Sequence, residues 1–226
     1  MRSAGGPDFS SPAHTVLMPA GYGEGMGHLE RAHHLSTYRL DATDGVAGRV
    51  HDLYFDDRRW LVRYLVVDVH HALSSRRVLI SPMCVRSTDA GSRRFTVSLT
   101  REQIRRSPGV DADRPVSRQH EVMLHEYYRL PFYWKDEHPL DTRTADPHLR
   151  SMRAIRGYTV IGRDAAVGHV DDFLVDCGAW TVSDVLIARR QWLAGTRRCL
   201  PVSAIGRVSW VGKAVYLDTA AVGQTA

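Results

Sequence analysis

The 226-residue chain has almost no lysine and only three cysteines. Lys135 and Lys213 are the only lysines, so arginines make up the rest of the 30 basic residues. Cys84, Cys177 and Cys199 are odd in number, and no two of them have the C-x-x-C spacing of a zinc or redox site. We therefore expect free thiols in a reducing compartment and no disulfide framework.

Long blocks of basic charge are also lacking. With 25 acidic residues, the chain has a net charge of +5, which implies a mild attraction to phosphates or to an anionic membrane face. The arginines are nevertheless spread out, and their groups are short pairs: Arg76-Arg77, Arg93-Arg94, Arg105-Arg106 and Arg197-Arg198. A nucleic-acid arm needs a longer run of like charges. The pattern favours a solvated arginine-rich surface and makes nucleic acid an unexpected partner.

No apolar run approaches the ~20 residues of a membrane-spanning helix. The first 27 residues, MRSAGGPDFSSPAHTVLMPAGYGEGMG, contain no apolar core of signal-peptide length. We expect a cytoplasmic protein that begins with a flexible leader rich in Gly, Pro and Ser. The proportions of hydrophobic residues (43%) and charged residues (24%) are ordinary for a soluble globular protein.

Catalytic motifs are missing as well. The chain has no G-x-S-x-G, no Walker loop and no H-E-x-x-H, and the glycine-rich stretch Gly21–Gly27 follows no predicted strand. Twelve histidines raise the question of a metal site, but none has the spacing of zinc ligands. The adjacent pairs are His33-His34 and His70-His71, while Glu121 and His125, with His120 and Glu126 beside them, are interpreted as a pair on a solvated helix. We predict no enzyme activity, no catalytic, cofactor-binding or metal residues, and no cofactor.

What the chain does contain is the same unit twice. Residues 168–187, GHVDDFLVDCGAWTVSDVLI, align on residues 48–67, GRVHDLYFDDRRWLVRYLVV, without a gap after a shift of 120 positions. Between positions 38 and 67 eight pairs are identical, where chance gives roughly two. These pairs are Tyr38/Tyr158, Asp44/Asp164, Gly48/Gly168, Val50/Val170, Asp52/Asp172, Asp56/Asp176, Trp60/Trp180 and Val62/Val182.

The second copy predicts that both stretches are β-hairpins. Its centre is Asp176-Cys177-Gly178-Ala179, in which Gly178 supplies the positive φ of a tight turn. The first copy has Asp56-Asp57-Arg58-Arg59 there, and Asp tolerates the left-handed region. The flanks are rich in the β-branched and aromatic residues that strands prefer. We expect the repeated aspartates to bond turns and strand ends, and the repeated tryptophans to pack on the core.

The rest of the unit predicts a small barrel. Short strands are expected at Tyr38–Leu40, Val78–Ser81 and Phe95–Leu99, with a helical turn at Pro82–Val85. Five or six short strands in about 65 residues suit a closed barrel, which has no exposed edges. Such a unit would be only marginally stable alone.

Two helices and a linker are predicted between the copies. One spans Thr100–Ser107, with Thr100 as its cap. The other is amphipathic over Pro115–Leu130, with Asp113 or Ser117 as start signals and with these candidates for its buried face: Val116, Met123, Leu124, Tyr127 and Tyr128. Leu130–Trp134 is expected to cover apolar surface, and Lys135–Arg150 to be the linker. The predicted organisation is a leader (1–35), barrel 1 (36–109), a helical and aromatic connector with linker (110–150), barrel 2 (151–220) and a tail (221–226).

The stretch GRVHDLYFDDRRWLVRYLVVDV, followed by RRVLISP, resembles the PRC-barrel domain. That family includes the cytoplasmic part of the photosynthetic reaction-centre H subunit and the C-terminal half of a ribosome maturation factor. The doubled layout is most similar to tandem PRC-barrel proteins, and the resemblance covers about residues 36–220. It implies a mainly β fold of two small PRC-type barrels joined by a helical segment, and it implies no catalytic residue. In copy 2, RCLPV replaces VLISP and the TREQI helix has no counterpart.

Three functions follow as expectations. The leading one is a non-enzymatic protein-binding or scaffold protein, because small barrels fill their interior with side chains and leave only their outside for partners. The resemblance also implies a peripheral membrane component at the inner face of the plasma membrane, which would support electron or proton transfer in photosynthesis and attach through a partner or basic patches. The third is a ribosome or RNA factor, for which Tyr127-Tyr128-Arg129 is the one candidate for base stacking. The partner and the oligomeric state stay open.

Overall fold

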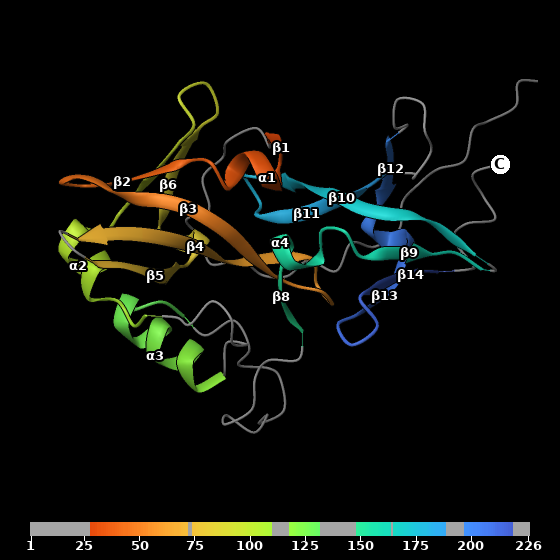
Figure 1. The fold of residues 1–226 in the computed structure, drawn as a ribbon. Helices are drawn as coiled ribbons and strands as arrows, with labels where there is room; N and C mark the ends of the chain where they lie inside the picture. The colour runs from red at the N-terminus through yellow and green to blue at the C-terminus, as the bar shows by residue number, and fades with distance from the viewer. Residues whose placement is uncertain are drawn as a thin grey trace, which may run out of the picture.

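The computed structural model describes residues 28–71, 74–109, 118–131, 148–163, 165–188 and 197–218. They are mainly β, as predicted (Figure 1). We call residues 28–109 repeat 1 and residues 148–218 repeat 2. The elements of repeat 1 are β1 (Leu29–Arg31), α1 (Ala32–Leu35), β2 (Arg39–Ala42), β3 (Gly45–Asp56), β4 (Leu61–His71), β5 (Ser74–Ile80), the 3-10 turn η1 (Pro82–Cys84), β6 (Val85–Asp89), β7 (Arg94–Val97) and α2 (Arg101–Arg106).

Repeat 2 reproduces this order of elements from β1 to β7. It consists of β8 (Leu149–Ser151), α4 (Met152–Ile155), β9 (Thr159–Ile161), β10 (Ala166–Asp176), β11 (Thr181–Ala188), β12 (Arg197–Pro201), η2 (Val202–Ala204), β13 (Ile205–Ser209) and β14 (Ala214–Leu217). The offset between counterparts is the 120 residues of the sequence alignment. The strand β6 and its counterpart β13 were not predicted, because their alternating residues are mostly polar and small.

Both predicted hairpins are present, as β3–β4 and β10–β11. The expected source of the turn geometry was wrong. Within these two turns the residues with positive φ are Trp60 (53°) and Trp180 (55°), and Gly178 is not among the described glycines with positive φ. In each turn the aspartate side chain accepts two backbone N–H groups, from Arg58 and Arg59 at Asp56 and from the equivalent residues at Asp176. The aspartate side chain thus stabilises each turn, and the second strand of each hairpin begins directly after the tryptophan.

The positive φ is costly for a bulky residue, and packing of the indole offsets that cost. Trp180 is 3% exposed, and its ring lies 5.4 Å from the ring of Phe95 in the other repeat. Trp60 stacks 5.4 Å from Phe55. The expectation that both tryptophans pack on the core is confirmed.

The hydrogen-bonded strand order is β5-β4-β3-β2-β7-β6 in repeat 1 and β12-β11-β10-β9-β14-β13 in repeat 2. Neighbours are antiparallel except β2–β7 and β9–β14, which are parallel. The repeats join where β4 meets β11, at Leu61 and Thr181. The result is one 14-stranded sheet that is open rather than closed, because in the described residues β5 does not pair with β6, nor β12 with β13. The end strands of each order are consecutive in the chain, connected by η1 or η2.

The two repeats share one hydrophobic core. Its fully buried side chains come from both copies, and Phe55 of repeat 1 lies 5.5 Å from Phe173 of repeat 2, measured between ring centroids. A shared core solves the problem of a repeat too small to be stable alone, because each repeat covers apolar surface of the other.

The first strand of each repeat is exchanged. β1, from the start of repeat 1, pairs with β10 of repeat 2, and β8, from the start of repeat 2, pairs with β3 of repeat 1. The helices that follow, α1 and α4, bury Leu35 and Ile155 in the shared core. This corrects two predicted boundaries: residues 29–35 of the expected leader and Leu149–Arg150 of the expected linker are structural. Residues 1–27, 132–147 and the predicted tail lie outside the described residues.

The two connecting helices are present. The predicted Thr100 cap of α2 is confirmed as a reciprocal capping box with Gln103. The amphipathic helix is α3 (Arg118–Tyr128), which lies against β4 and β5 (Figure 1) and buries Leu124 with Tyr64. Two residues predicted for its buried face, Met123 and Tyr127, are instead 49% and 37% exposed. No helix in the described part of the chain is long and apolar enough to cross a membrane.

Candidate functional site at the boundary between the repeats

The repeated aspartates Asp52 and Asp172 hold the boundary together. Both are buried, at 6% and 2% exposed, and each accepts the N–H of the residue that follows it, at 2.8 and 3.0 Å. Oδ1 of Asp52 also accepts the N–H of Arg153 in α4 (3.1 Å), and Oδ1 of Asp172 accepts the N–H of His33 in α1 (3.2 Å). The first N–H groups of a helix have no partner within it. Each repeat therefore caps the short helix of the other, a role beyond the predicted strand-end bonding.

The two carboxylates differ in their remaining contacts. Ser151 donates its hydroxyl to Oδ2 of Asp52 (2.5 Å), whereas Nδ1 of His33 lies 3.7 Å from Oδ2 of Asp172. Burial raises the pKa of Asp52 above its ordinary value, and the hydrogen bonds from Ser151 and the backbone oppose that rise only in part. The boundary thus contains a carboxyl group that loses its proton less readily than an exposed aspartate.

A polar hollow of about 190 Å³ lies beside Asp52, between α1 and α4. Its lining residues are Ala32, His33, Ser36, His51, Asp52, Leu53, Met152, Arg153 and Arg156. This volume is below the ~300–1,000 Å³ of typical small-molecule sites. A wider hollow of about 430 Å³ lies beside α2 and is lined by charged and small residues, among them Asp44, Arg101 and Glu102.

His51 is the side chain in the smaller hollow that most resembles a catalytic base. Its Nδ1 lies 3.1 Å from Oδ2 of Asp68, and its Nε2 lies 3.1 Å from a guanidinium nitrogen of Arg153. Because arginine can only donate, Nε2 accepts and Nδ1 carries the proton. Asp68 also accepts from Arg77 (3.0 Å). The lone pair that would take a substrate proton is therefore engaged, and this chain of polar contacts links β5, β4 and β3 to α4.

A second pair of equivalent contacts lies at the hairpin turns. The N–H of Asp57 bonds the carbonyl of His148 (3.0 Å), and the N–H of Cys177 bonds that of His28 (3.1 Å). The buried Asp57 carboxylate also contacts Nδ1 of His148 and Nε of Arg150, both at 2.8 Å. At the equivalent place burial, with a smaller effect of Glu30, raises the pKa of the Cys177 thiol to about 12. One turn is thus tied by an ion pair across the boundary, whereas the other has a buried thiol in the place of that carboxylate.

Glu30 in β1 contacts several polar side chains. It contacts Nδ1 of His34 (3.0 Å) and accepts from the Tyr38 hydroxyl (3.4 Å). Burial alone would raise the pKa of Glu30, but the backbone N–H of Arg31 and the His34 side chain outweigh it and hold the pKa below its ordinary value. Burial first, and then the Glu30 charge, raise the pKa of Tyr38 to about 12. Among the described residues no three His, Cys, Asp or Glu side chains converge to hold a metal ion.

The interpretation of Glu121 and His125 as a solvated pair was wrong, because both are buried, at 0% and 2% exposed. Oε2 of Glu121 accepts the Tyr64 hydroxyl (2.9 Å), and Nδ1 of His125 lies 2.8 Å from the carbonyl of Pro131. The side of α3 that contains Glu121 and His125 therefore faces the sheet. The sequence pattern could not reveal this, because polar residues on a helix predict a side that faces solvent. Glu126 is exposed, and the side chains of His70, His71 and His120 lie outside the described residues.

The aromatic pair suggested for base stacking is used for packing. The Tyr127 hydroxyl donates to the carbonyl of Gln103 (2.7 Å), and its ring meets Tyr128 edge to face at 5.1 Å. Burial raises the pKa of Tyr128, whose side chain is mostly covered. Both rings are thus engaged in contacts within the helical segment, while Tyr127 remains 37% exposed.

The exchanged strands were missed, although the sequence carries a signal for them. The 120-residue shift also places identical residues at His28/His148 and Leu29/Leu149, and similar ones at Leu35/Ile155. Extending the alignment upstream of Tyr38 would have revealed that the repeat begins there. Its pairing with the opposite copy could not be seen from one sequence.

A scan against models of protein families finds no match for this chain, and a search of curated proteins finds none.

Proposed function

We propose that the chain is a non-enzymatic binding or scaffold protein built on two PRC-type barrel units. The connections between end strands support the barrel units. β5 and β6 lie at opposite ends of the strand order, yet only Ser81–Cys84 separate them. That segment can span at most about 18 Å, so the sheet of repeat 1 has to curl until its two edges approach. η2 imposes the same curl on repeat 2.

A filled interior supports a role on the outside. The largest fully buried side chains, among them Tyr38, Phe55, Phe95 and Phe173, belong to the one hydrophobic core that both repeats share. Barrels of this size have room for side chains alone. Partners would then bind outer faces, loops and helices.

The observation that carries the proposal is the reciprocal exchange of β1 and β8. It makes one body of two repeats, so that two outer faces keep a fixed relation to each other. Those faces are not equivalent. α3 covers Tyr64 and Leu79 of repeat 1, whereas their counterparts in repeat 2 are Asp184 and Cys199, and Cys199 is exposed. A rigid body with two unlike faces suits a protein that holds two partners, or two parts of one partner.

Affinity capture from a lysate of the native host, with quantitative mass spectrometry, tests this proposal. The full chain is compared with Met123→Glu on the exposed face of α3 and with Cys199→Glu on the uncovered face of repeat 2. We expect a reproducible set of proteins, with a different subset lost in each variant. A third variant, Val46→Thr, changes an exposed strand residue in neither face and should retain every partner. Capture of no protein above the bare-resin background, or identical losses in both variants, would contradict the proposal.

A further inference from the structure

We propose that the tip of the β13–β14 hairpin, residues Trp210–Lys213, binds the surface of an anionic lipid membrane. This goes beyond the scaffold role, since it assigns a lipid contact to one loop of repeat 2. Trp210 is 51% exposed and Val211 is 96% exposed. They follow each other directly in the chain, and Val211 is the most exposed of the large hydrophobic residues in the described part of the chain.

The fold itself does not need apolar residues at this tip. The equivalent hairpin of repeat 1, β6–β7, has Ala90 and Gly91 at the same positions. There the turn is closed by Asp89, whose carboxylate accepts the N–H and the hydroxyl of Ser92 at 3.0 and 2.6 Å. The two hairpins keep the same strand pairing. A polar tip therefore builds the same structure, and the exposed indole and isopropyl groups call for another explanation.

The tip is a fixed projection. The N–H of Gly212 donates to Oγ of Ser209 (3.1 Å), and the carbonyl of Lys213 accepts from Thr159 of β9 (3.1 Å). The Trp210 ring meets Tyr158 edge to face at 6.5 Å. Its apolar groups are thus held outward, so contact with a partner would need little further ordering of the loop.

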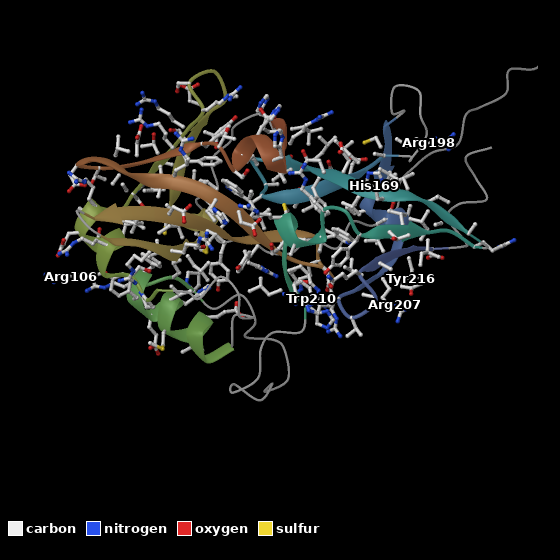
Figure 2. All side chains as sticks on the ribbon, viewed as in Figure 1. Arg106, His169, Arg198, Arg207, Trp210 and Tyr216 are labelled. Atoms are coloured by element: carbon white, nitrogen blue, oxygen red, sulfur yellow. The ribbon has the colours of Figure 1, made fainter. Side chains whose placement is uncertain are left out.

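Two basic residues lie in the same hairpin as the tip. Lys213 lies in the turn, and Arg207 of β13 holds its guanidinium 4.4 Å from the centre of the Tyr216 ring. Figure 2 shows Arg207, Trp210 and Tyr216 together along the lower edge of this hairpin. No carboxylate occurs between residues 205 and 217, because Ser209 replaces the aspartate of the other repeat. Basic residues near a membrane attract anionic headgroups.

This chemistry fits a lipid surface better than a protein groove. Tryptophan prefers the membrane–water interface, where its ring is apolar and its N–H stays wet. A stable protein interface takes about 20–30 residues from each side, and a single turn offers two apolar side chains. Shallow insertion of such a pair, reinforced by nearby basic residues, is how interfacial segments bind membranes.

Sedimentation of the full chain with vesicles tests the assignment. Phosphatidylcholine vesicles are compared with vesicles that also contain phosphatidylserine, at low and at high salt. We expect binding to the anionic vesicles that salt weakens. The double variant Trp210→Ala/Val211→Ser should lose at least tenfold in partitioning, and Arg207→Gln and Lys213→Gln about fivefold each. The matched control Ala90→Ser/Gly91→Ser, at the other hairpin, should bind like the wild type.

Quenching by brominated lipids locates the contact independently of the amount bound. The chain has five tryptophans, so the quenching of Trp210→Phe is subtracted from that of the wild type, and we expect Trp210 to account for most of it. Circular dichroism and thermal unfolding of every variant verify the fold. Failure of the wild type to sediment with anionic vesicles at low salt would overturn the assignment. So would unchanged binding of the tip double variant, or tip-dependent retention of a soluble protein without vesicle binding.

Discussion

Replacement of Asp52 by alanine should destabilise the whole molecule, because this carboxylate joins the two repeats. It accepts its own neighbour's N–H, the N–H of Arg153 and the hydroxyl of Ser151. Alanine would leave two backbone donors without this acceptor, the buried N–H of Leu53 and the partly buried N–H of Arg153, at about 1–3 kcal/mol for a buried group. The adjoining hollow can admit a water in place of the carboxylate, which offsets part of the loss. We expect the free energy of unfolding to fall by about 2–4 kcal/mol.

Asp172→Ala provides the matched comparison. Asp172 caps α1 through His33 with the same geometry, but it is not among the residues that line the hollow. Asp172→Ala should therefore lower the free energy of unfolding by at least as much as Asp52→Ala does. Asp52→Asn keeps an accepting oxygen and should cost less than about 1 kcal/mol. Urea unfolding followed by tryptophan fluorescence measures all three variants. A loss below about 0.5 kcal/mol for Asp52→Ala, or equal losses for the alanine and asparagine variants, would refute this account of the boundary.

The same residue predicts a pH dependence. Burial raises the pKa of Asp52 in the folded state above its ordinary value of 3.8. Between that value and the folded pKa, the folded state binds more protons than the unfolded state, so the contribution of Asp52 to stability falls as the pH rises. Asp52→Asn cannot titrate. The stability of the wild type relative to this variant should therefore decrease as the pH rises above the ordinary value of 3.8. A difference that is flat or increases with pH would show that the folded pKa is not raised.

Three further predictions test other parts of the fold. Leu35→Ala should lower the free energy of unfolding by about 2–5 kcal/mol, because Leu35 is fully buried. Leu29→Ala, at a half-exposed site, should change the free energy of unfolding by less than about 1 kcal/mol. Equal effects of the two substitutions would contradict the structural role of α1. Gly48→Ala and Gly168→Ala should each lower the free energy of unfolding, measured by chemical denaturation, by about 1–3 kcal/mol. The reason is that an added Cβ would clash with a carbonyl oxygen of the neighbouring strand in both repeats. Unchanged stability of the alanine variants would contradict that close approach. In the native chain a thiol reagent should label Cys199 but neither Cys84 nor Cys177, because burial of these two thiols raises their pKa values to about 12. After denaturation the reagent should label all three. Rapid labelling of all three thiols in the native chain would contradict this prediction.

The sequence predicted the local elements well. The strand-like flanks and the turn aspartate Asp56 define the hairpin because they act on neighbouring backbone. The cap at Thr100 was predicted for the same reason. Local reasoning failed where packing decides: Glu121 and His125 are polar in sequence, yet tertiary contacts place them inside, with the Tyr64 hydroxyl as partner. Likewise, Met123 suited a buried face by its chemistry but faces solvent.

From the residues alone it follows that the chain is mainly β, that one unit occurs twice, and that an aspartate forms each hairpin turn, because residue pattern and turn chemistry act over a few neighbours. How the units combine depends on tertiary packing: the strands of both repeats form one open sheet, and Leu29–Leu35 and its counterpart each complete the other repeat. Two equivalent units contain the same kinds of pairing edge, so a strand can satisfy its hydrogen bonds on its own copy or on the other. The choice between them depends on burial in the shared core, which a single sequence does not encode in any local pattern.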